Sequence, residues 1–124
     1  MFHDPTAFAF ARTLARNTAV IRAELLALDP GEFQPWVEHD LYGQDGWRIF
    51  PFFSGGRYEE GKYAGLPEQY QLNASRCPRT MEILGTLPGC VTAGFSMLLP
   101  GAHIVPHCGE ERGLYRCHLC LVEA

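Results

Sequence analysis

The sequence has 124 residues, of which 47% are hydrophobic and 19% are charged, and its formal net charge is −4. The acidic balance and the lack of a Lys/Arg cluster argue against a protein that binds nucleic acids or anionic membranes. No stretch approaches the ~20 apolar residues of a membrane span, and the N-terminus lacks the basic and apolar regions of a secretory signal. We therefore expect one globular, cytoplasmic domain without nucleic-acid or membrane partners.

The first half of the chain predicts one helix and one strand. Residues 4–6 suit the start of a helix. The positions that would share one face of this helix then recur in steps of four and three, at Leu14, Thr18, Ile21, Leu25 and Leu28. Proline and glycine at 30–31 end this amphipathic helix, which we expect to pack on a sheet. Residues 47–53 are aromatic and β-branched and predict a strand, in which Pro51 favours an edge or a bulge. The aromatic side chains of this strand are expected in the core: Trp47, Phe50, Phe52 and Phe53.

The second half predicts a loop, a helix and three strands. Residues 57–72 contain two glycines and a proline and predict a long loop. Residues 77–87 predict a second helix, which opens at Pro78. Three short apolar runs, separated by turn residues, predict successive strands at 91–99, 102–107 and 113–122. The predicted fold class is therefore α+β.

The predicted strands carry polar side chains that suit a small site. Because alternate residues of a strand share a face, Arg116 and His118 are expected to point the same way. His107 ends the preceding predicted strand beside a glycine turn, a position from which side chains often reach a metal. The planar fork of Arg116 matches a carboxylate, and Ser96 offers a hydroxyl to the same anion. These residues predict a site for a divalent metal beside a small molecule that carries a carboxylate.

Each of these residues also has a structural interpretation. Taken singly, His107 and His118 are more often ordinary histidines bonded to backbone carbonyls. A strand hydroxyl such as Ser96 needs no ligand, and Arg116 has acidic neighbours with which it can pair, namely Glu110, Glu111 and Glu123.

The cysteines suggest a further hypothesis, a structural zinc site. Cys117 and Cys120 have C-x-x-C spacing, and Cys108 and His107 lie nearby in the sequence. On a regular strand, however, residues three apart face opposite sides, and no turn residue lies between Cys117 and Cys120. The odd number of cysteines, five, favours reduced thiols that fill the sheet.

The run 95–109, FSMLLPGAHIVPHCG, followed by YRCHLCL at 115–121, resembles the signature of the aspartyl/asparaginyl β-hydroxylase family. That signature is a Ser-bearing strand, Pro-Gly, a His followed by x-Gly, and Arg-x-His-Leu-x-Leu. Weaker similarity extends upstream over most of the chain. The resemblance implies a dioxygenase that uses Fe(II) and the co-substrate 2-oxoglutarate. It also implies that His107 is the first iron ligand and that Ser96, Arg116 and His118 contact the carboxylates of 2-oxoglutarate.

The fold implied by the resemblance is a set of N-terminal helices packed on a double-stranded β-helix, or jelly roll. We expect a single domain over 1–124, with a helical and loop region at 1–90 and the first core strands at 91–124. In the family, later strands supply a second iron His and another Arg. No residue of this sequence matches them, so we expect the domain to be incomplete.

The expected reaction is hydroxylation of an aspartyl/asparaginyl-type or other amino-acid substrate, weak or absent in this chain alone. The alternative is a non-catalytic module that binds a partner. Because open strand edges are templates for strand addition, we also expect self-association.

Overall fold

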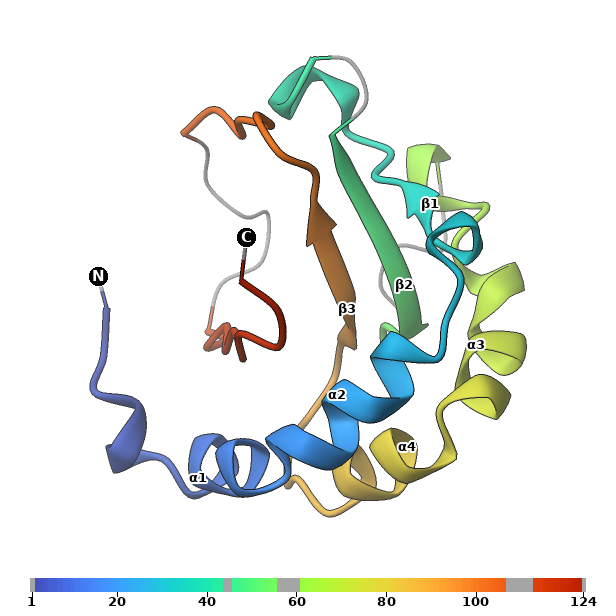
Figure 1. The fold of residues 1–124 in the computed structure, drawn as a ribbon. Helices are drawn as coiled ribbons and strands as arrows, with labels where there is room; N and C mark the ends of the chain where they lie inside the picture. Colours follow the sequence, from blue (N-terminus) through green and yellow to red (C-terminus); the bar gives the residue numbers. More distant parts are fainter. Residues whose placement is uncertain (1, 44–45, 56–60, 107–112, 124) are drawn as a thin grey trace.

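The structure is a computed structural model that describes residues 2–43, 46–55, 61–106 and 113–123. Its helices are α1 (Ala9–Arg16), α2 (Thr18–Leu26), α3 (Tyr70–Arg76) and α4 (Pro78–Gly85), and its strands are β1 (Gln34–Pro35), β2 (Trp47–Phe53) and β3 (Ala93–Leu98). The strands form one antiparallel sheet in the order β1-β2-β3, and the helices follow an arc beside it (Figure 1). The α+β prediction is confirmed. A jelly roll needs two facing sheets, and the described residues form one, so that fold stays a prediction.

The predicted first helix is in fact two helices. Asn17 separates α1 from α2 with φ −105° and ψ 14°, and its side-chain amide donates to the Thr13 carbonyl oxygen at 2.8 Å. Asparagine competes in this way with the backbone for hydrogen bonds, and therefore interrupts helices. The helix ends earlier than predicted, at Leu26, and a capping box between Asp29 and Glu32 then opens a separate 3-10 turn at Pro30–Glu32.

The predicted strand at 47–53 is confirmed as β2, but it is the central strand and not an edge. Its proline is accommodated by the predicted irregularity, a register shift between Pro51 and Phe53. On β3 the residue opposite Pro51 is Gly94, where an added Cβ would lie 2.9 Å from both the Phe50 carbonyl oxygen and the Pro51 Cα. Only glycine allows the two strands to approach this closely.

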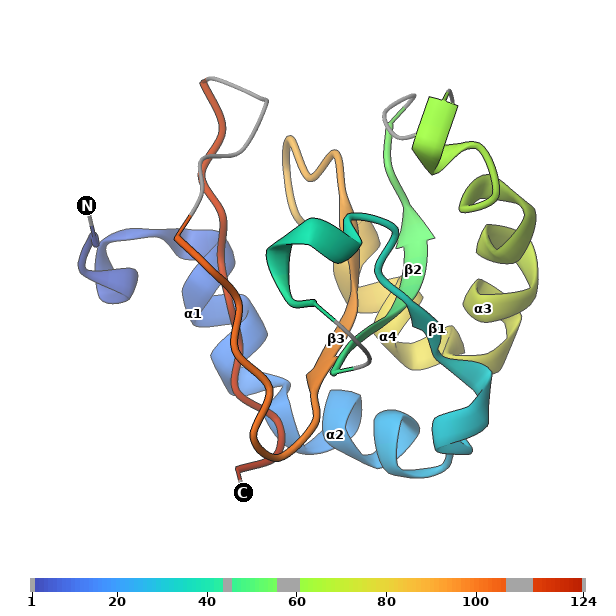
Figure 2. The same cartoon turned by 90° about the horizontal axis from the view of Figure 1, so that it is seen from above.

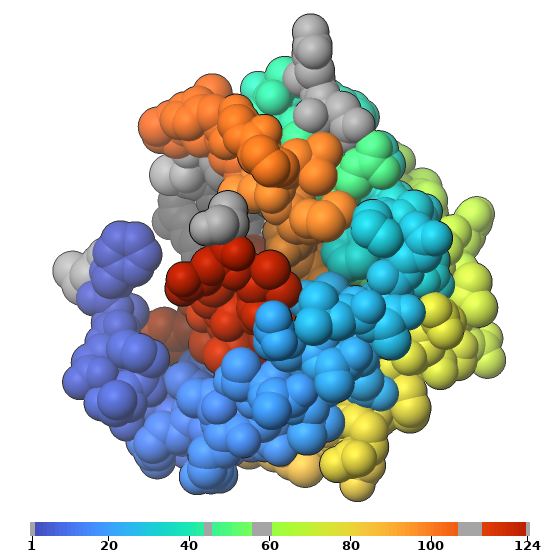
Figure 3. All heavy atoms as spheres, in the orientation of Figure 1, coloured from blue at the N-terminus to red at the C-terminus, as the bar shows by residue number. Residues whose placement is uncertain are grey.

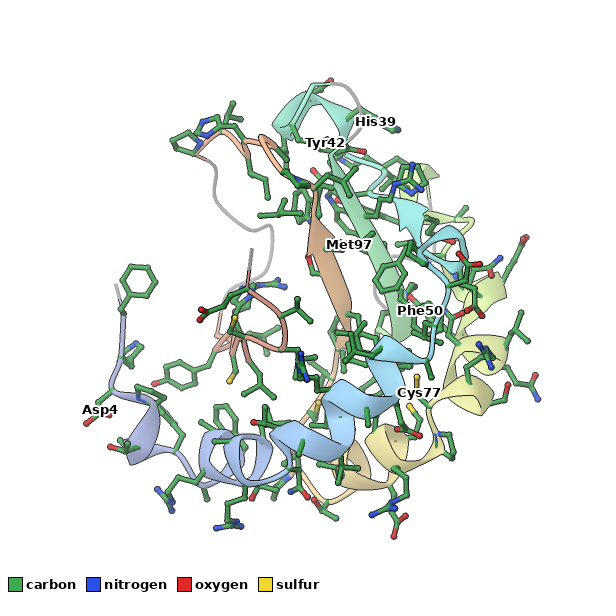
Figure 4. All side chains as sticks on the ribbon, in the orientation of Figure 1. Asp4, His39, Tyr42, Phe50, Cys77 and Met97 are labelled. Atoms are coloured by element: carbon green, nitrogen blue, oxygen red, sulfur yellow. The ribbon has the colours of Figure 1, made fainter. Side chains whose placement is uncertain are left out.

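The core lies between the sheet and helices α2, α3 and α4. Its buried members are Ile21, Leu28, Phe33, Phe50, Phe52, Cys77 and Phe95. Figure 4 shows Phe50 and Cys77 in this layer, between β2 and the helices. Helix α3 is also tied to the sheet, because the Asn73 side chain donates to the Pro51 carbonyl oxygen at 2.8 Å. Among the described residues, no helix is both long and apolar enough to cross a bilayer.

The prediction of a loop over residues 57–72 was wrong at the C-terminal end of this range. Pro67 opens a 3-10 turn, Pro67–Gln69, that leads directly into α3 at Tyr70. Proline at the first position of a turn loses no hydrogen bond, so it initiates this helical region instead of excluding one. The predicted second helix is confirmed as α4, with Pro78 at its first position.

Of the three predicted C-terminal strands, the described residues form only the first, as β3. Residues 102–106 and 113–123 are not strands, and His107 lies outside the described residues. A strand requires a backbone partner along its length. The Val105 N–H donates to the Leu41 carbonyl oxygen at 2.7 Å, but no described residue forms a ladder with either segment. Instead, the segment 113–123 passes beside α1 and α2 (Figure 2).

Candidate functional site

Ser96 lies on the face of the sheet that points away from the core. Its neighbour Phe95 is buried and pairs with Phe50 on the core face, whereas Ser96 is exposed and pairs with Ile49. The Ser96 Oγ accepts a hydrogen bond from the Trp47 Nε1 at 2.9 Å. Because an indole N–H can only donate, Ser96 must accept here, and its own O–H is left to donate to a ligand. An anion such as a carboxylate fits this hydroxyl.

Trp47 occupies a cluster of aromatic rings at the end of the sheet where β2 begins. Its ring centroid lies 5.5 Å from that of Trp36 and 5.9 Å from that of Tyr42, which meets it edge-on. The Tyr42 hydroxyl donates to the Trp36 carbonyl oxygen at 2.5 Å and lies 3.0 Å from His39 Nδ1. Figure 4 shows Tyr42 and His39 together at this end of the sheet.

The prediction that Trp47 belongs to the core with the phenylalanines of β2 was wrong. Phe50 and Phe52 are buried on the core face, but Trp47 is half-buried on the opposite face. The sequence did contain a signal for this arrangement. Residues of a strand that are an odd number of positions apart, such as 47 and 50, face opposite sides of the sheet. The hydrogen bond to Ser96 was not accessible from the sequence, since it joins residues 49 positions apart.

Arg116 and His118 lie on the segment 113–123, and both are exposed. The predicted alternation of faces holds from His118 onward: Leu119 and Leu121 pack against the core, while His118 and Cys120 face outward. The segment 113–123 is not part of the sheet, and Leu119 and Leu121 pack beside the helices instead. The guanidinium Nε of Arg22 on α2 donates to the Leu121 carbonyl oxygen at 2.9 Å.

The other end of this segment is held by aromatic rings near the N-terminus. The ring centroid of Tyr115 lies 5.1 Å from that of His3 and 5.0 Å from that of Phe8. In the space-filling view, the segment lies between the N-terminal residues and α2 (Figure 3). These contacts position the backbone that carries Arg116 and His118, and sequence analysis did not identify them.

The structure does not bring all predicted site residues together. Within the described part of the chain, no hydrogen bond, ion pair or ring contact joins Ser96 to Arg116 or His118. His107, the predicted iron ligand, lies outside the described residues. The predicted co-substrate contacts and the predicted metal ligand therefore remain predictions.

A metal site is likewise not formed by the described residues alone. Across 2–43, 46–55, 61–106 and 113–123, no three His, Cys, Asp or Glu side chains are grouped to hold a metal ion. Cys117 and Cys120, from the zinc hypothesis, are exposed free thiols. His107 and Cys108 lie outside the described residues, so the described side chains do not by themselves fit iron or zinc.

Comparison with known proteins gives the family. The family model for aspartyl/asparaginyl beta-hydroxylase matches residues 15–124. The ornithine lipid ester-linked acyl 2-hydroxylase of Rhizobium tropici is 26% identical over 120 residues, which are 97% of this chain and 41% of that protein. The aspartyl/asparaginyl beta-hydroxylase of Mus musculus is 31% identical over 114 residues, 90% of this chain and 14% of that protein. The chain thus spans less than half the length of either relative. Because the family model covers most of its residues, the chain belongs to the aspartyl/asparaginyl β-hydroxylase family.

Proposed function

We propose that this chain acts in an Fe(II)- and 2-oxoglutarate-dependent hydroxylase. The observation that carries the proposal is the family match over residues 15–124, which includes all four predicted site residues. In the overall reaction, a substrate C–H bond becomes C–OH while 2-oxoglutarate and O₂ yield succinate and CO₂. One oxygen atom enters the product and the other enters succinate, so the atoms balance without a further reductant.

In this proposal three side chains bind the co-substrate and one binds the metal. The guanidinium of Arg116 pairs with a carboxylate of 2-oxoglutarate through two parallel hydrogen bonds. Ser96 and His118 donate to the co-substrate carboxylates, and His107 is a ligand of iron. The exposure of Ser96, Arg116 and His118 supports these roles, because a side chain that binds a ligand must be reachable.

The names of the two relatives suggest a substrate class. The acyl 2-position and the β-carbon of an aspartyl or asparaginyl residue are both bonded directly to a carbonyl carbon. We propose that the substrate of this protein also carries its reactive C–H next to a carboxyl, amide or ester carbonyl. An aspartyl/asparaginyl-type or other amino-acid substrate meets this description, and so does an acyl chain.

The test is succinate formation from 2-oxoglutarate by the protein that the gene encodes, with Fe(II), O₂ and either an Asp/Asn peptide or an ornithine lipid. We expect Fe(II)-dependent turnover that His107→Ala abolishes, while His103→Ala, the same exchange at an exposed histidine of the same region, retains it. Arg116→Ala is expected to raise the KM for 2-oxoglutarate by more than about tenfold, since truncating one partner of a charged pair is costly. Arg16→Ala on α1 is the matched control. Turnover that persists in His107→Ala, or an unchanged KM in Arg116→Ala, contradicts the corresponding role.

A further inference from the structure

We propose that the N-terminal surface of the protein docks on an anionic lipid bilayer and brings the neighbouring candidate site to the acyl chains. This role rests on the proposed function and deepens it, because it selects the acyl chain of a membrane lipid from the substrates proposed above. The N-terminal surface is made of Phe2, His3, Phe8, Phe10, Arg12, Arg16 and Tyr115. Figure 1 shows the N-terminal residues and α1 at the end of the arc of helices opposite α3.

The first feature of this surface is a cluster of aromatic rings that the core does not cover. The ring centroid of Phe8 lies 6.0 Å from that of His3 and 5.3 Å from that of Phe10. Tyr115, which contacts both His3 and Phe8, is 64% exposed, and Phe2 is fully exposed. Among the described residues, the core cluster and the side chains packed against it include none of these rings. A contiguous exposed patch of this kind marks an interaction surface.

The second feature is a positive charge at this end of an acidic protein. Of the 10 Lys and Arg and the 14 Asp and Glu in the chain, residues 1–23 contain three arginines and one acidic residue, Asp4. The Asp4 carboxylate already accepts from the N–H and the hydroxyl of Thr6, at 2.9 Å and 2.7 Å. The net charge of −4, averaged over the chain, disfavours a membrane partner, but this end carries the opposite sign.

Arg12 and Arg16 hold this charge beside the ring cluster. Phe8, Arg12 and Arg16 follow one another in steps of four, so their side chains lie along one side of α1. The Arg12 guanidinium donates to the Thr6 carbonyl oxygen at 2.5 Å, and that of Arg16 to the Thr13 hydroxyl at 3.4 Å. Within the described part of the chain, neither arginine forms an ion pair with a carboxylate. Both charges are therefore available to anionic groups of a partner.

Aromatic rings beside arginines fit the interface of an anionic bilayer. Aromatic side chains are enriched at the depth of the headgroups, and each Lys or Arg close to an anionic membrane adds attraction. A guanidinium also matches the phosphate of a lipid headgroup in two hydrogen bonds. A second copy of the chain fits less well, because a symmetric dimer through this surface would bring like charges together.

Tyr115 connects the N-terminal surface to the candidate site. Arg116 follows it directly and His118 lies two residues further on, so the segment that carries both side chains begins at the docked surface. Interfacial proteins insert their apolar side chains at the boundary between headgroups and acyl chains. The ester carbonyl of a lipid and the carbon bonded to it lie at the same boundary. The proposed reaction at a C–H next to a carbonyl therefore takes place at the depth that this surface reaches.

The test is flotation of the protein that the gene encodes with vesicles of equal parts phosphatidylcholine and phosphatidylglycerol, compared with vesicles of phosphatidylcholine alone. We expect binding to the anionic vesicles that weakens with added salt, because salt screens exposed charges. Phe2→Ser should lower this binding about tenfold and Arg16→Gln about fivefold, the usual worth of one buried aromatic side chain and of one cationic side chain at an anionic membrane. Leu72→Ser on α3 and Arg79→Gln on α4 make matched exchanges at exposed positions outside the surface and should bind as wild type does.

Three results would overturn the docking surface. The wild-type protein binds neither kind of vesicle, or the Phe2 and Arg16 variants bind as their controls do, or Phe2→Ser reduces self-association in sedimentation velocity without reducing vesicle binding. The last result would show that a second copy covers this surface.

Succinate formation separates this inference from the proposed function. Turnover with an Asp/Asn peptide by a protein that does not bind vesicles leaves the proposed function standing and refutes the docking. Vesicle binding together with turnover on the peptide but not on the lipid refutes the selection of an acyl chain. Vesicle binding through Phe2 and Arg16 without succinate formation on either substrate refutes the proposed function and leaves the docking surface supported.

Discussion

Among the described cysteines, only Cys77 is completely removed from water by the fold. Its relative exposure is 0%, and it packs in the core between α3 and α4, whereas Cys117 and Cys120 are exposed. Burial, and to a smaller extent the negative charge of Glu24, raises the pKa of the Cys77 thiol from 9.0 to about 11. The interpretation of the cysteines as apolar filler is therefore confirmed for Cys77, where an uncharged thiol is required.

The raised pKa predicts a loss of stability in alkaline solution. The unfolded chain loses the Cys77 proton near pH 9, while the folded chain keeps it to about pH 11, so the unfolded state binds fewer protons in this interval. The free energy of unfolding should therefore fall from about pH 9 to pH 11, by up to about 2 kcal/mol from this group. Urea unfolding at several pH values measures the fall. Cys77→Ala, although less stable at neutral pH, should show a smaller decline, and an equal decline in both proteins would refute the prediction.

At the scale of elements, the sequence predicted those that depend on local patterns. The β2 strand and the helix that begins at Pro78 follow from propensity and from proline geometry, and both are present. Elements that depend on distant partners were missed. The apolar alternation of 113–122 resembles a strand, but strand formation also needs a neighbouring backbone, and the described residues give this segment helices α1 and α2 instead.

Helix α4 shows a second long-range dependence, because its N-terminus is capped by another helix. Cys77, at the N-cap position, makes no side-chain hydrogen bond to the helix. The carboxylate of Glu24 on α2 accepts from the Arg79 N–H at 3.1 Å, the Thr80 N–H at 2.5 Å and the Thr80 hydroxyl at 2.7 Å. A negative charge at this end also suits the helix dipole. No capping motif in the sequence around Pro78 predicts this arrangement.

Removing this interhelical cap should destabilise the protein. Thr80 is only 2% exposed, so Glu24→Ala leaves a buried hydroxyl and helix N–H groups without their acceptor, at a cost of about 1–3 kcal/mol. Glu24→Gln keeps an acceptor oxygen without the charge and should lose less. Urea unfolding provides the comparison, with Glu68→Ala at an exposed position as the control. A Glu24→Ala protein as stable as Glu68→Ala would show that the cap contributes nothing.

At the scale of the whole molecule, the sequence identified the types of the candidate site residues better than their arrangement. Ser96 is on a strand as predicted, but its bond to Trp47 depends on the register of β2 and β3. The exposure of His118 follows from alternation with Leu119, whereas the position of the segment depends on distant contacts such as that of Arg22 with Leu121. A local motif specifies residue types, and tertiary contacts determine where they meet.

The order of the strands leaves the two edges of the sheet unequally protected. Strand β1 is only two residues long and contains Pro35, and both features discourage the addition of another strand. Strand β3, at the opposite edge, has six residues and contains neither proline nor a charged side chain. Among the described residues none pairs with its outer edge, so a second copy of the chain has a strand to which it can add.

We therefore expect concentration-dependent self-association through the outer edge of β3. Leu98, at the end of β3, is 54% exposed, and a lysine there would place a positive charge on the edge strand of each copy. Because a charge on an edge strand opposes pairing, Leu98→Lys should shift the protein towards monomer in sedimentation velocity. Leu72→Lys makes the same exchange at an exposed leucine of α3 and should not. If Leu72→Lys reduces self-association as much as Leu98→Lys does, the association is a general apolar contact and not strand pairing. If the wild-type protein is monomeric at every concentration, this interface does not form.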